Sequence, residues 1–420
     1  MPKAPYSQQK EARRQNTSLL LRDLWRHGPL SKAMLAQRNG LTKGTVAAIC
    51  ADLSAMGLIR EAGQDHTGLG RPGDLLELNP SARCAVGVEI STNYTAVALT
   101  DLCGDPLARS SALIEVGSSQ EAILAQAEAL IAQAIDRAQE CGCSLLGIGV
   151  AVPGLVDPGP ESLVSAPALG WKEVPLKQIW EQRFAVPVVV ENKARAAAAA
   201  EALNGSAQNA RSFVYVSMGT DVRSSVQAAV VTDGLPFEGA HGLAVDAGHM
   251  ILDPQGPLCA CGQQGCWQAM TDVAREVELA RARLAAGEAS VLAHHAAGEN
   301  SLDHRTIHQA AVNGDALALD ILRTVQRNHT LGVTNLVRLF DPELVVIGWA
   351  SVALSEANHT RMHALSDLLD LPGDVRQQLA RRGVVPPTIV HAVHGPEASL
   401  VGAAALLVDQ FLRTPPAFEV

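Results

Sequence analysis

The stretch GIGVAVPGLVD, residues 147–157, carries the clearest fold signal in the chain. Together with the two leucines before it, this stretch forms an apolar run that stops at Pro153-Gly154. A short apolar run that ends at a turn signal is typical of a strand that is buried on both faces. We therefore predict a buried strand over residues 145–152 and a turn directly after it.

Strands and helices alternate on both sides of this stretch. Apolar runs predict the strands, and longer periodic segments predict the helices. The other expected strands cover residues 84–90, 96–100, 186–191 and 344–348, a hairpin covers 212–231, and the expected helices include 120–140 and 194–203. This alternation indicates an α/β body, and two sets of strands predict two lobes with a cleft between them.

Residues 1–80 follow a different pattern. The expected elements there are helices over 18–26, 32–39 and 43–56 and strands over 58–61 and 75–78. Ser31 and Thr42 stand where amino-terminal caps of the second and third helices are expected. Short helices joined by a tight glycine-containing turn and followed by a strand pair predict a winged helix-turn-helix.

Candidate DNA-reading residues follow from this arrangement. The outward, amino-terminal face of the third helix carries Lys43, Thr45 and Ala48, where such domains contact bases in the major groove. Arg71 lies in the glycine- and proline-rich loop between the two strands, a setting from which an arginine can enter the narrow minor groove. An ordinary surface turn is the alternative interpretation of this loop. We predict that these four residues contact double-stranded DNA.

Charge is distributed unevenly along the chain. The whole chain has a net charge of -10, whereas residues 1–80 hold 11 Lys and Arg against 7 Asp and Glu. A basic end on an acidic body fits a DNA-binding module attached to a part that does not touch DNA. No apolar run approaches the roughly 20 residues of a membrane span, and residues 1–15 lack the apolar core of a signal peptide. We therefore expect a cytoplasmic protein without a membrane partner.

Five stretches together resemble the ROK family, which comprises repressors, open reading frames and sugar kinases. These stretches are residues 147–157, APALGW at 166–171, ENKA at 191–194, Gly248-His249 and CACGQQGC at 259–266. The resemblance implies a two-lobed, actin-like ATPase fold, and the head is the feature of the repressor branch. The implied domains are a head over 1–80, a first lobe over 81–200 and a second lobe with a metal loop over 201–420.

The candidate metal ligands are one histidine and three cysteines: His249, Cys259, Cys261 and Cys266. One imidazole and three thiolates complete a closed tetrahedral zinc shell, which leaves no open position for a catalytic water. Gly262 and Gly265 would let the loop turn back so that the last cysteine reaches the same ion. We predict a structural zinc, and reduced cysteines in a metal-free loop are the alternative.

The resemblance also identifies departures from the kinases of the family. Their catalytic base is the Asp that follows Glu-Asn, and this position is Lys193 here. A protonated lysine cannot accept the proton of a sugar hydroxyl. Three phosphate- and adenosine-binding turns also depart from the family pattern, at residues 89–93, 219–225 and 348–350. The first of them lacks both glycines that let backbone approach phosphate. We therefore expect neither kinase activity nor ATP as a cofactor.

The sugar site of the family is only partly retained. The candidate ligand-binding positions are Asn192, Lys193, Asp246, His249 and Gln268. Asn192 and His249 agree with the family pattern, whereas Asp246 and Gln268 each replace a glutamate and Ala168 replaces an asparagine. We expect a sugar-type effector bound with altered affinity, and a vestigial pocket is the alternative. The positive charge of Lys193 and Arg195 adds the hypothesis of an anionic ligand, such as a sugar phosphate or sugar acid.

The sequence as a whole predicts a sugar-responsive repressor of carbohydrate-metabolism genes. A homodimer or homotetramer would place paired heads on an operator, and an effector in the cleft would shift them out of register. Because His249 belongs to both the metal site and the sugar site, the metal loop is expected to transmit this change. Two alternatives are an active sugar kinase with a DNA-binding head and a repressor that is controlled by a protein partner.

Overall fold

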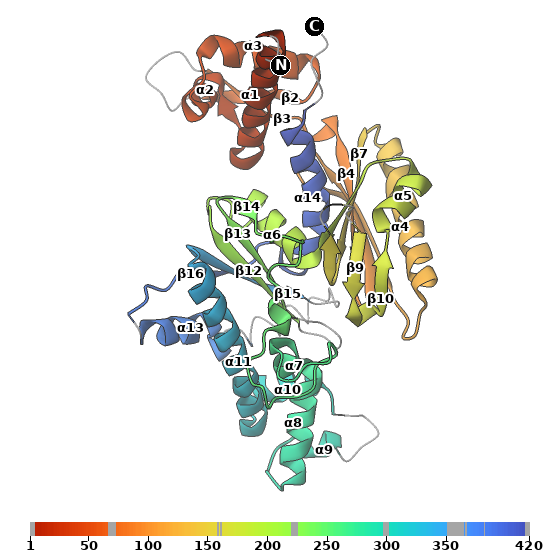
Figure 1. Ribbon diagram of the computed structural model, residues 1–420, viewed down its shortest axis with the longest axis vertical. Coiled ribbons are helices and arrows are strands. Elements are labelled where there is room, and N and C mark those ends of the chain that lie inside the picture. Colours follow the sequence, from red (N-terminus) through yellow and green to blue (C-terminus); the bar gives the residue numbers. More distant parts are fainter. Residues whose placement is uncertain are drawn as a thin grey trace.

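A head, a first lobe and a second lobe follow one another along the longest axis of the molecule (Figure 1). The computed structural model describes residues 5–65, 73–157, 159, 162–219, 226–296, 302–350, 365, 368–381 and 383–415. Within these ranges, no helix has both the length and the apolar character that a membrane span needs.

The head consists of three helices and a small antiparallel sheet. Its elements are α1 (Pro5–His27), β1 (Leu30–Ser31), α2 (Lys32–Asn39), α3 (Lys43–Ala55), β2 (Ile59–Asp65) and β3 (Gly73–Leu78). Ser31 and Thr42 cap α2 and α3, because each side-chain oxygen accepts a hydrogen bond from a backbone N–H of the first turn. The winged helix-turn-helix is thus formed as predicted, although α1 begins at Pro5 and not near residue 16. The added turns are polar and rich in good helix formers, so apolar periodicity could not reveal them.

The first lobe is built on a five-stranded sheet in the order β11-β7-β4-β5-β6. Its strands are β4 (Cys84–Ile90), β5 (Tyr94–Asp101), β6 (Pro106–Leu113), β7 (Leu145–Val152) and β11 (Val188–Asn192). One face is covered by α4 (Gln120–Glu140), α5 (Leu176–Phe184) and a small sheet of β8 (Leu155–Asp157), β9 (Ser162–Ala166) and β10 (Trp171–Val174). The bounds of β7 and α4 agree with the prediction, whereas β6 and the small sheet were not expected.

The second lobe repeats this strand pattern. Its sheet has the order β14-β13-β12-β15-β16. Counted from β14 in this lobe and from β6 in the first lobe, two antiparallel pairings are followed by two parallel ones. The strands are β12 (Phe213–Gly219), β13 (Gln227–Thr232), β14 (Leu235–Pro236), β15 (Leu344–Ala350) and β16 (Thr388–His391). The helices are α7 (Trp267–Thr271), α8 (Val273–Ala285), α9 (Ala293–Ala296), α10 (His304–Val312), α11 (Ala316–Phe340) and α13 (Leu371–Ala380). The duplicated sheet confirms the predicted two-lobed α/β body.

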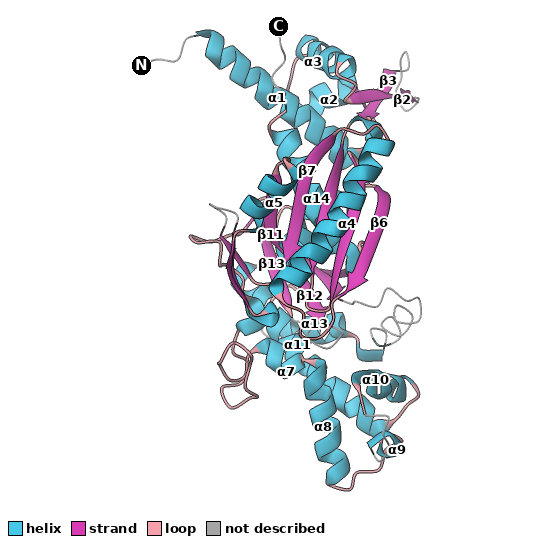
Figure 2. Cartoon of the chain, turned by 90° about the vertical axis from the view of Figure 1, so that its right-hand side faces the viewer, coloured by secondary structure: helices cyan, strands magenta, loops and turns pink. Residues whose placement is uncertain are grey.

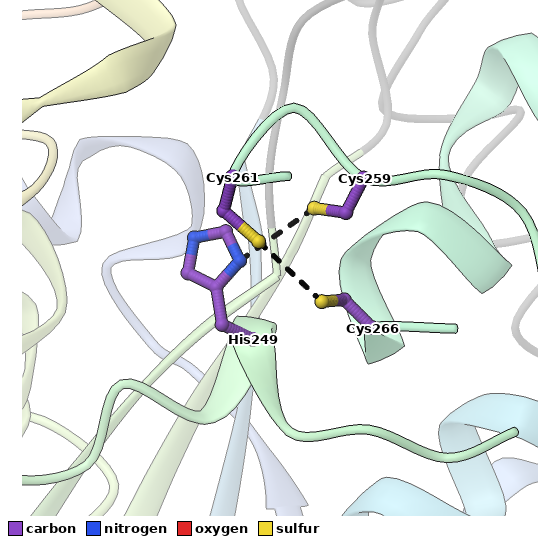
Figure 3. Close-up of side chains that lie close together, drawn as sticks. All are labelled: His249, Cys259, Cys261 and Cys266. Atoms are coloured by element: carbon purple, nitrogen blue, oxygen red, sulfur yellow. Dashed lines mark hydrogen bonds between the residues drawn. The ribbon is translucent and has the colours of Figure 1, made fainter. Parts of the chain in front are cut away.

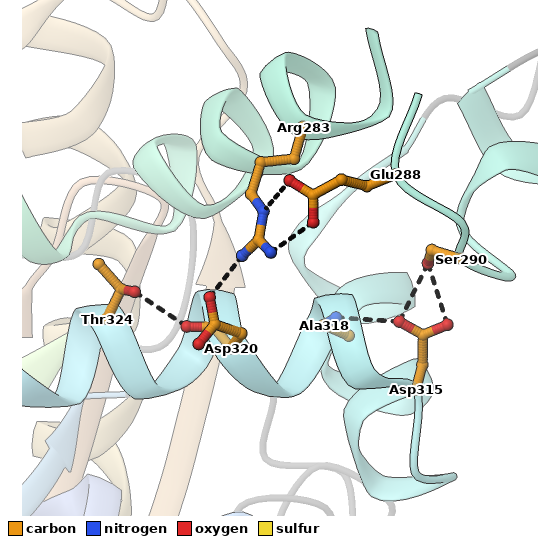
Figure 4. A network of polar contacts seen from close by, with 7 residues as sticks. All are labelled: Arg283, Glu288, Ser290, Asp315, Ala318, Asp320 and Thr324. Carbon is orange, nitrogen blue, oxygen red and sulfur yellow. Dashed lines mark hydrogen bonds and ion pairs between the residues drawn. The ribbon is translucent and has the colours of Figure 1, made fainter. Parts of the chain in front are cut away.

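A polar network ties the helices at the far end of this lobe together (Figure 4). Arg283 of α8 forms ion pairs with Glu288, in the turn that follows, and with Asp320 of α11. Asp315 caps α11 and also accepts a hydrogen bond of 3.0 Å from the Ser290 hydroxyl. The turn after α8 is therefore held against the start of α11.

The last helix, α14 (Ala398–Arg413), returns to the first lobe and covers the face of its sheet opposite α4 (Figures 1 and 2). The glycines of the strands make room for it. A Cβ atom on Gly149 would lie 1.8 Å from the Ala403 carbonyl oxygen, and one on Gly87 would lie 2.4 Å from that of Leu400. Residues 398–413 therefore pack mainly on the first lobe, although the predicted boundary of 201–420 placed them in the second lobe; Ala398, at the start of the helix, shares a core cluster with second-lobe strands. Their partners lie far away in sequence, where local patterns carry no signal.

The helix α6 (Lys193–Asn204) lies between the two sheets. Ala194, Ala197 and Ala198 pack on the second-lobe strands β12 and β13, whereas Ala196 shares a small cluster with α14 and β7. Short 3-10 turns complete the description: η1 (Pro80–Ala82), η2 (Pro167–Leu169), η3 (Ala247–His249) and η4 (Gly395–Glu397). The helix that follows the segment ENKA thus touches both lobes.

Candidate functional site

The start of α3 presents the expected DNA-reading face. Lys43 and Ala48 are exposed, and Thr45 is half-buried. The Thr45 backbone N–H donates to the Thr42 hydroxyl at 3.2 Å, so the amino-terminal turn is fixed by its cap. Behind this face, Val46, Ile49 and Leu53 are fully buried in the core of the head. The helix therefore offers one solvent-facing side at the end that would enter a groove.

Three expectations fall on parts that the structure does not describe. Arg71 lies within residues 66–72, and most of the second phosphate turn lies within 220–225; both segments are outside the described residues. Trp349 belongs to β15, but its side chain is likewise outside the description. The predicted roles of these residues stay predictions.

The four candidate metal ligands converge at one point (Figure 3). Their ligand atoms all lie within 4.8 Å of one another. Cys259 Sγ is 3.6 Å from His249 Nδ1, and Cys261 Sγ is 3.6 Å from Cys266 Sγ. Zinc–sulfur bonds of about 2.3 Å at tetrahedral angles place two sulfurs about 3.8 Å apart. The cluster can therefore hold a tetrahedral metal ion, and its soft sulfur donors suit zinc better than magnesium or calcium.

The loop reaches this geometry through its two glycines, as predicted. Gly262 and Gly265 both have left-handed backbone, with φ of 90° and 70°. A Cβ atom on Gly265 would lie 1.5 Å from the Asp253 carbonyl oxygen, so no other residue fits there. Burial raises the pKa of the Cys266 thiol to about 12. A cation beside the sulfur is the natural means of keeping such a thiol deprotonated.

The metal loop is anchored to the second lobe by the residue after its last cysteine. Trp267 is fully buried, and its ring lies against Gly332 of α11, where a Cβ atom would approach it to 2.3 Å. Its indole N–H donates to His329 Nδ1 at 3.3 Å. Burial lowers the pKa of His329 to about 4, so the neutral imidazole keeps this nitrogen as an acceptor.

A cavity of about 800 Å³, counted with its open mouth, lies between the lobes. Four of the five predicted ligand-binding residues line it: Asn192, Asp246, His249 and Gln268. Val245, directly before Asp246, has a φ of 65°, which is rare for a β-branched residue. Strain of this kind costs about 1–3 kcal/mol and is kept where the surroundings impose it. We name this space the sugar-side cavity.

Asn192 has a structural role that was not foreseen from the sequence. Its side-chain oxygen accepts from the backbone N–H groups of Ala194 and Arg195 and so caps α6. Its amide nitrogen donates to the Gly154 carbonyl at 2.7 Å. Gly154 has a φ of 100°, and a Cβ atom on it would lie 2.1 Å from the Ser165 carbonyl oxygen. One amide hydrogen of Asn192 is left to meet a ligand.

Lys193 lines a second, adjoining cavity of about 560 Å³. Its ammonium group lies 2.6 Å from Glu89 Oε1 and donates to Ser91 Oγ at 3.2 Å. Glu89 is only 2% exposed and also accepts hydrogen bonds from Tyr94 and Ser399. Burial, together with Glu89, raises the pKa of Tyr94 well above its usual value, so its hydroxyl stays a donor. We name this space the phosphate-side cavity, because the residues of the family's first phosphate turn line it.

Arg195 is placed in the sugar-side cavity and is only 8% exposed. Its Nε lies 2.6 Å from Glu191 Oε1, and one terminal nitrogen donates to the Gly242 carbonyl at 2.9 Å. Burial raises the pKa of Glu191, although Arg195 beside it acts in the opposite direction. Since Lys193 and Arg195 each already have a carboxylate partner, the geometry gives little support to the hypothesis of an anionic ligand.

Two residues of these cavities were missed at the level of sequence. Glu89 was recognised as a departure from the phosphate turn, but not as the partner of Lys193. The signal was the charge reversal at Lys193, since a lysine placed in a cleft needs an acidic partner nearby. Gln227 of β13, which lines both cavities, carries no motif that could have identified it.

Comparison with known proteins agrees with this architecture. The sequence pattern of the ROK family matches residues 85–410. The chain is 30% identical over 333 residues to a putative xylose repressor from Caldicellulosiruptor sp., a match that covers 79% of this chain and 82% of that protein. It is 27% identical over 399 residues to the xylose repressor of Bacillus subtilis, which covers 94% of this chain and 96% of that one.

A solved structure extends the similarity to the head. It is a ROK family transcriptional regulator described as a homolog of the E. coli MLC protein, and it matches with a TM-score of 0.76 at 25% identity. The match covers 96% of this chain and 97% of that structure. Since the family pattern spans the strands, the metal loop and both cavities, the chain belongs to the ROK family.

Proposed function

We propose that this protein is a DNA-binding transcriptional regulator that represses carbohydrate-metabolism genes and responds to a sugar without phosphorylating it. The observation that carries the proposal is the match to a ROK transcriptional regulator over 96% of the chain, which includes the head. Relatives named xylose repressors align over most or nearly all of the chain. The exposed start of α3 and the cleft between the lobes supply the two sites that such a regulator needs.

The absence of phosphoryl transfer is part of this proposal. The position of the catalytic base holds Lys193, whose charge is already neutralised by buried Glu89. A lysine in an ion pair cannot accept a proton from a sugar hydroxyl. ATP turnover with xylose and glucose would instead support the alternative of an active kinase that carries a DNA-binding head.

A structural zinc completes the proposal. His249, Cys259, Cys261 and Cys266 would hold the ion, and four protein ligands would leave no position for a catalytic water. The ion would fix the loop whose residues His249 and Cys261 border the sugar-side cavity. Metal analysis of the purified protein by mass spectrometry tests this point, with about one zinc per chain expected.

Selection from random DNA tests whether the protein binds a specific operator. Duplexes that bind the protein are isolated, and their affinity is measured with and without xylose, glucose, glucosamine or glucose 6-phosphate. A homodimer should select two half-sites whose centres lie about 34 Å apart or a multiple of this spacing. Failure to select any duplex would overturn the proposal, and selection without a sugar response would favour control by a protein partner.

Lys43→Ala should weaken binding to the selected duplex. Loss of one cation from the DNA-binding face means that about one fewer counterion is released on binding, which reduces the dependence of log Kd on log salt by about 1. The matched control is Lys172→Ala on β10, where an exposed lysine lies far from the head. Equal salt dependence in the two variants would exclude Lys43 from the DNA contact.

A further inference from the structure

We propose that Arg195 is the positioning residue that couples the sugar-side cavity to the DNA-reading head. This inference rests on the function proposed above. It assigns the coupling to a buried arginine and the two helices behind it, in addition to the metal loop that the sequence suggested.

Arg195 joins two segments across the cavity. It lies in the first turn of α6, where Glu191 at the end of β11 holds its Nε, and its terminal nitrogen reaches the carbonyl of Gly242. Gly242 is buried and lies in the loop that runs from β14 to η3. Asp246 and His249 follow in this same loop and line the cavity. A ligand that contacts the loop therefore acts on a segment that is hydrogen-bonded to α6.

The second step is the contact between α6 and α14. A Cβ atom on Gly402 would lie 1.8 Å from the Ala196 carbonyl oxygen, so the two helix backbones touch. Ala196 and Ala403 also share a cluster with Ala151 of β7. Close-packed contacts of this kind cannot be compressed, and a shift of α6 has to be followed by α14.

The third step joins α14 to the head. Leu407, Val408 and Leu412 of α14 are buried in the same core as Leu20 and Leu24 of α1. Arg22 of α1 lies 3.4 Å from Asp409 of α14, which adds an ion pair at the edge of this core. Gln208, in the segment after α6, donates to the Arg26 carbonyl at the end of α1. The head is thus fixed to the two helices that Arg195 connects to the cavity.

The test compares Arg195→Lys with the matched control Arg211→Lys. Lysine keeps the charge beside Glu191 but cannot make both the ion pair and the bond to Gly242 in the fork geometry of a guanidinium. Arg211 also pairs with a carboxylate, that of Asp233, but its side chain is 79% exposed and outside both cavities. The double variant Glu191→Gln, Arg195→Gln removes both buried charges together and serves if the lysine variant does not fold.

Three quantities are measured for each variant: the melting temperature, the affinity for sugar by calorimetry, and the Kd for the selected duplex with and without sugar. Allosteric coupling typically changes affinity by about 5- to 150-fold. We expect Arg195→Lys to keep its DNA affinity without sugar within about twofold, while the change induced by a saturating concentration of sugar, set from the calorimetric affinity of each variant, falls below about threefold. A response equal to that of Arg211→Lys would overturn the inference.

Amide hydrogen exchange separates this inference from the proposed function, because it needs no effector. In Arg195→Lys we expect faster exchange both in residues 239–249 and in α14, with no change in Arg211→Lys. Faster exchange in the loop alone would show that the loop is not coupled to α14 and would overturn the inference. If none of the four sugars changes the DNA affinity of the wild-type protein, that result counts against the proposed function. The exchange comparison between Arg195→Lys and Arg211→Lys stays valid in that case.

Discussion

The two adjoining cavities differ in how their polar groups are used. In the phosphate-side cavity, Lys193, Glu89, Tyr94 and Ser399 bond to one another. In the sugar-side cavity, Asp246 is exposed, and Asn192 keeps one amide hydrogen for a ligand. The cavities share Pro153, Ala168 and Gln227 as a common wall. The polar groups of the phosphate-side cavity are thus bonded to one another, whereas the sugar-side cavity still presents polar groups to a ligand.

This difference fits the proposal that the cleft binds a sugar without phosphorylating it. A buried charge is tolerated only with a partner. In the phosphate-side cavity, Glu89 is the partner of Lys193, so the charge of this lysine is already neutralised. In the sugar-side cavity, Arg195 and Glu191 form such a pair, whereas Asp246 is exposed and the metal loop borders the cavity.

Removal of the metal should have the largest effect on this comparison. Chelation, or Cys261→Ser, should loosen the loop that carries His249, since binding free energy of a structural zinc contributes directly to folding. We expect a lower melting temperature and faster amide exchange in residues 246–268, with little change around Glu89. Cys141→Ser, at an exposed cysteine outside the cluster, is the control. An equal increase in amide exchange in residues 246–268 and around Glu89 would show that the metal supports the whole cleft.

Lys193→Met should have the next largest effect. It leaves the Glu89 carboxylate buried without its cation, which typically costs about 3–5 kcal/mol of unfolding free energy. Denaturant unfolding measures this loss, and the double variant Glu89→Gln, Lys193→Met should recover most of it. Arg137→Met, which breaks an exposed pair with Glu140, should leave stability unchanged. A loss no greater than in this control would mean that the phosphate-side pair is not structural.

Asp246→Ala should have the smallest effect, confined to ligand affinity. Loss of a hydrogen bond to a charged group costs about 1.5–3 kcal/mol, or roughly 10- to 150-fold in Kd. Calorimetric titration with xylose, glucose, glucosamine and glucose 6-phosphate measures it. Ser91→Ala changes only the phosphate-side cavity and should alter sugar affinity by less than about twofold. If both variants weaken binding equally, the two cavities do not function separately.

Local signals in the sequence were sufficient for most of the fold. The bounds of β7, α2 and α4 follow from apolar periodicity and capping residues, which act over a few neighbouring positions. The metal cluster was predicted because its ligands lie close together in sequence and share one chemistry. The first turns of α1 were missed because they have no apolar face for periodicity to reveal.

Contacts between distant segments could not be predicted in the same way. Glu89 and Lys193 are more than a hundred positions apart, and no local pattern in either segment identifies the other residue as its partner. The double role of Asn192, as a helix cap and as a brace for the turn at Gly154, depends equally on how β11 and β7 pair. The glycines of GIGVAVPGLVD were recognised as part of a motif, but Gly149 is required by α14, which arrives from a distant part of the chain.

The return of α14 also sets an order for how the protein is made. Leu407 and Leu412 belong to the core of the head, and Ala403 fills the space left by Gly149 in the first lobe. The cores of both parts can therefore close only after residues 398–413 have been synthesised. A nascent chain that stalls before residue 398 holds all of α1 to α3 yet lacks one wall of the head. We therefore expect a chain truncated before residue 398 to hold its head less stably than the full chain does.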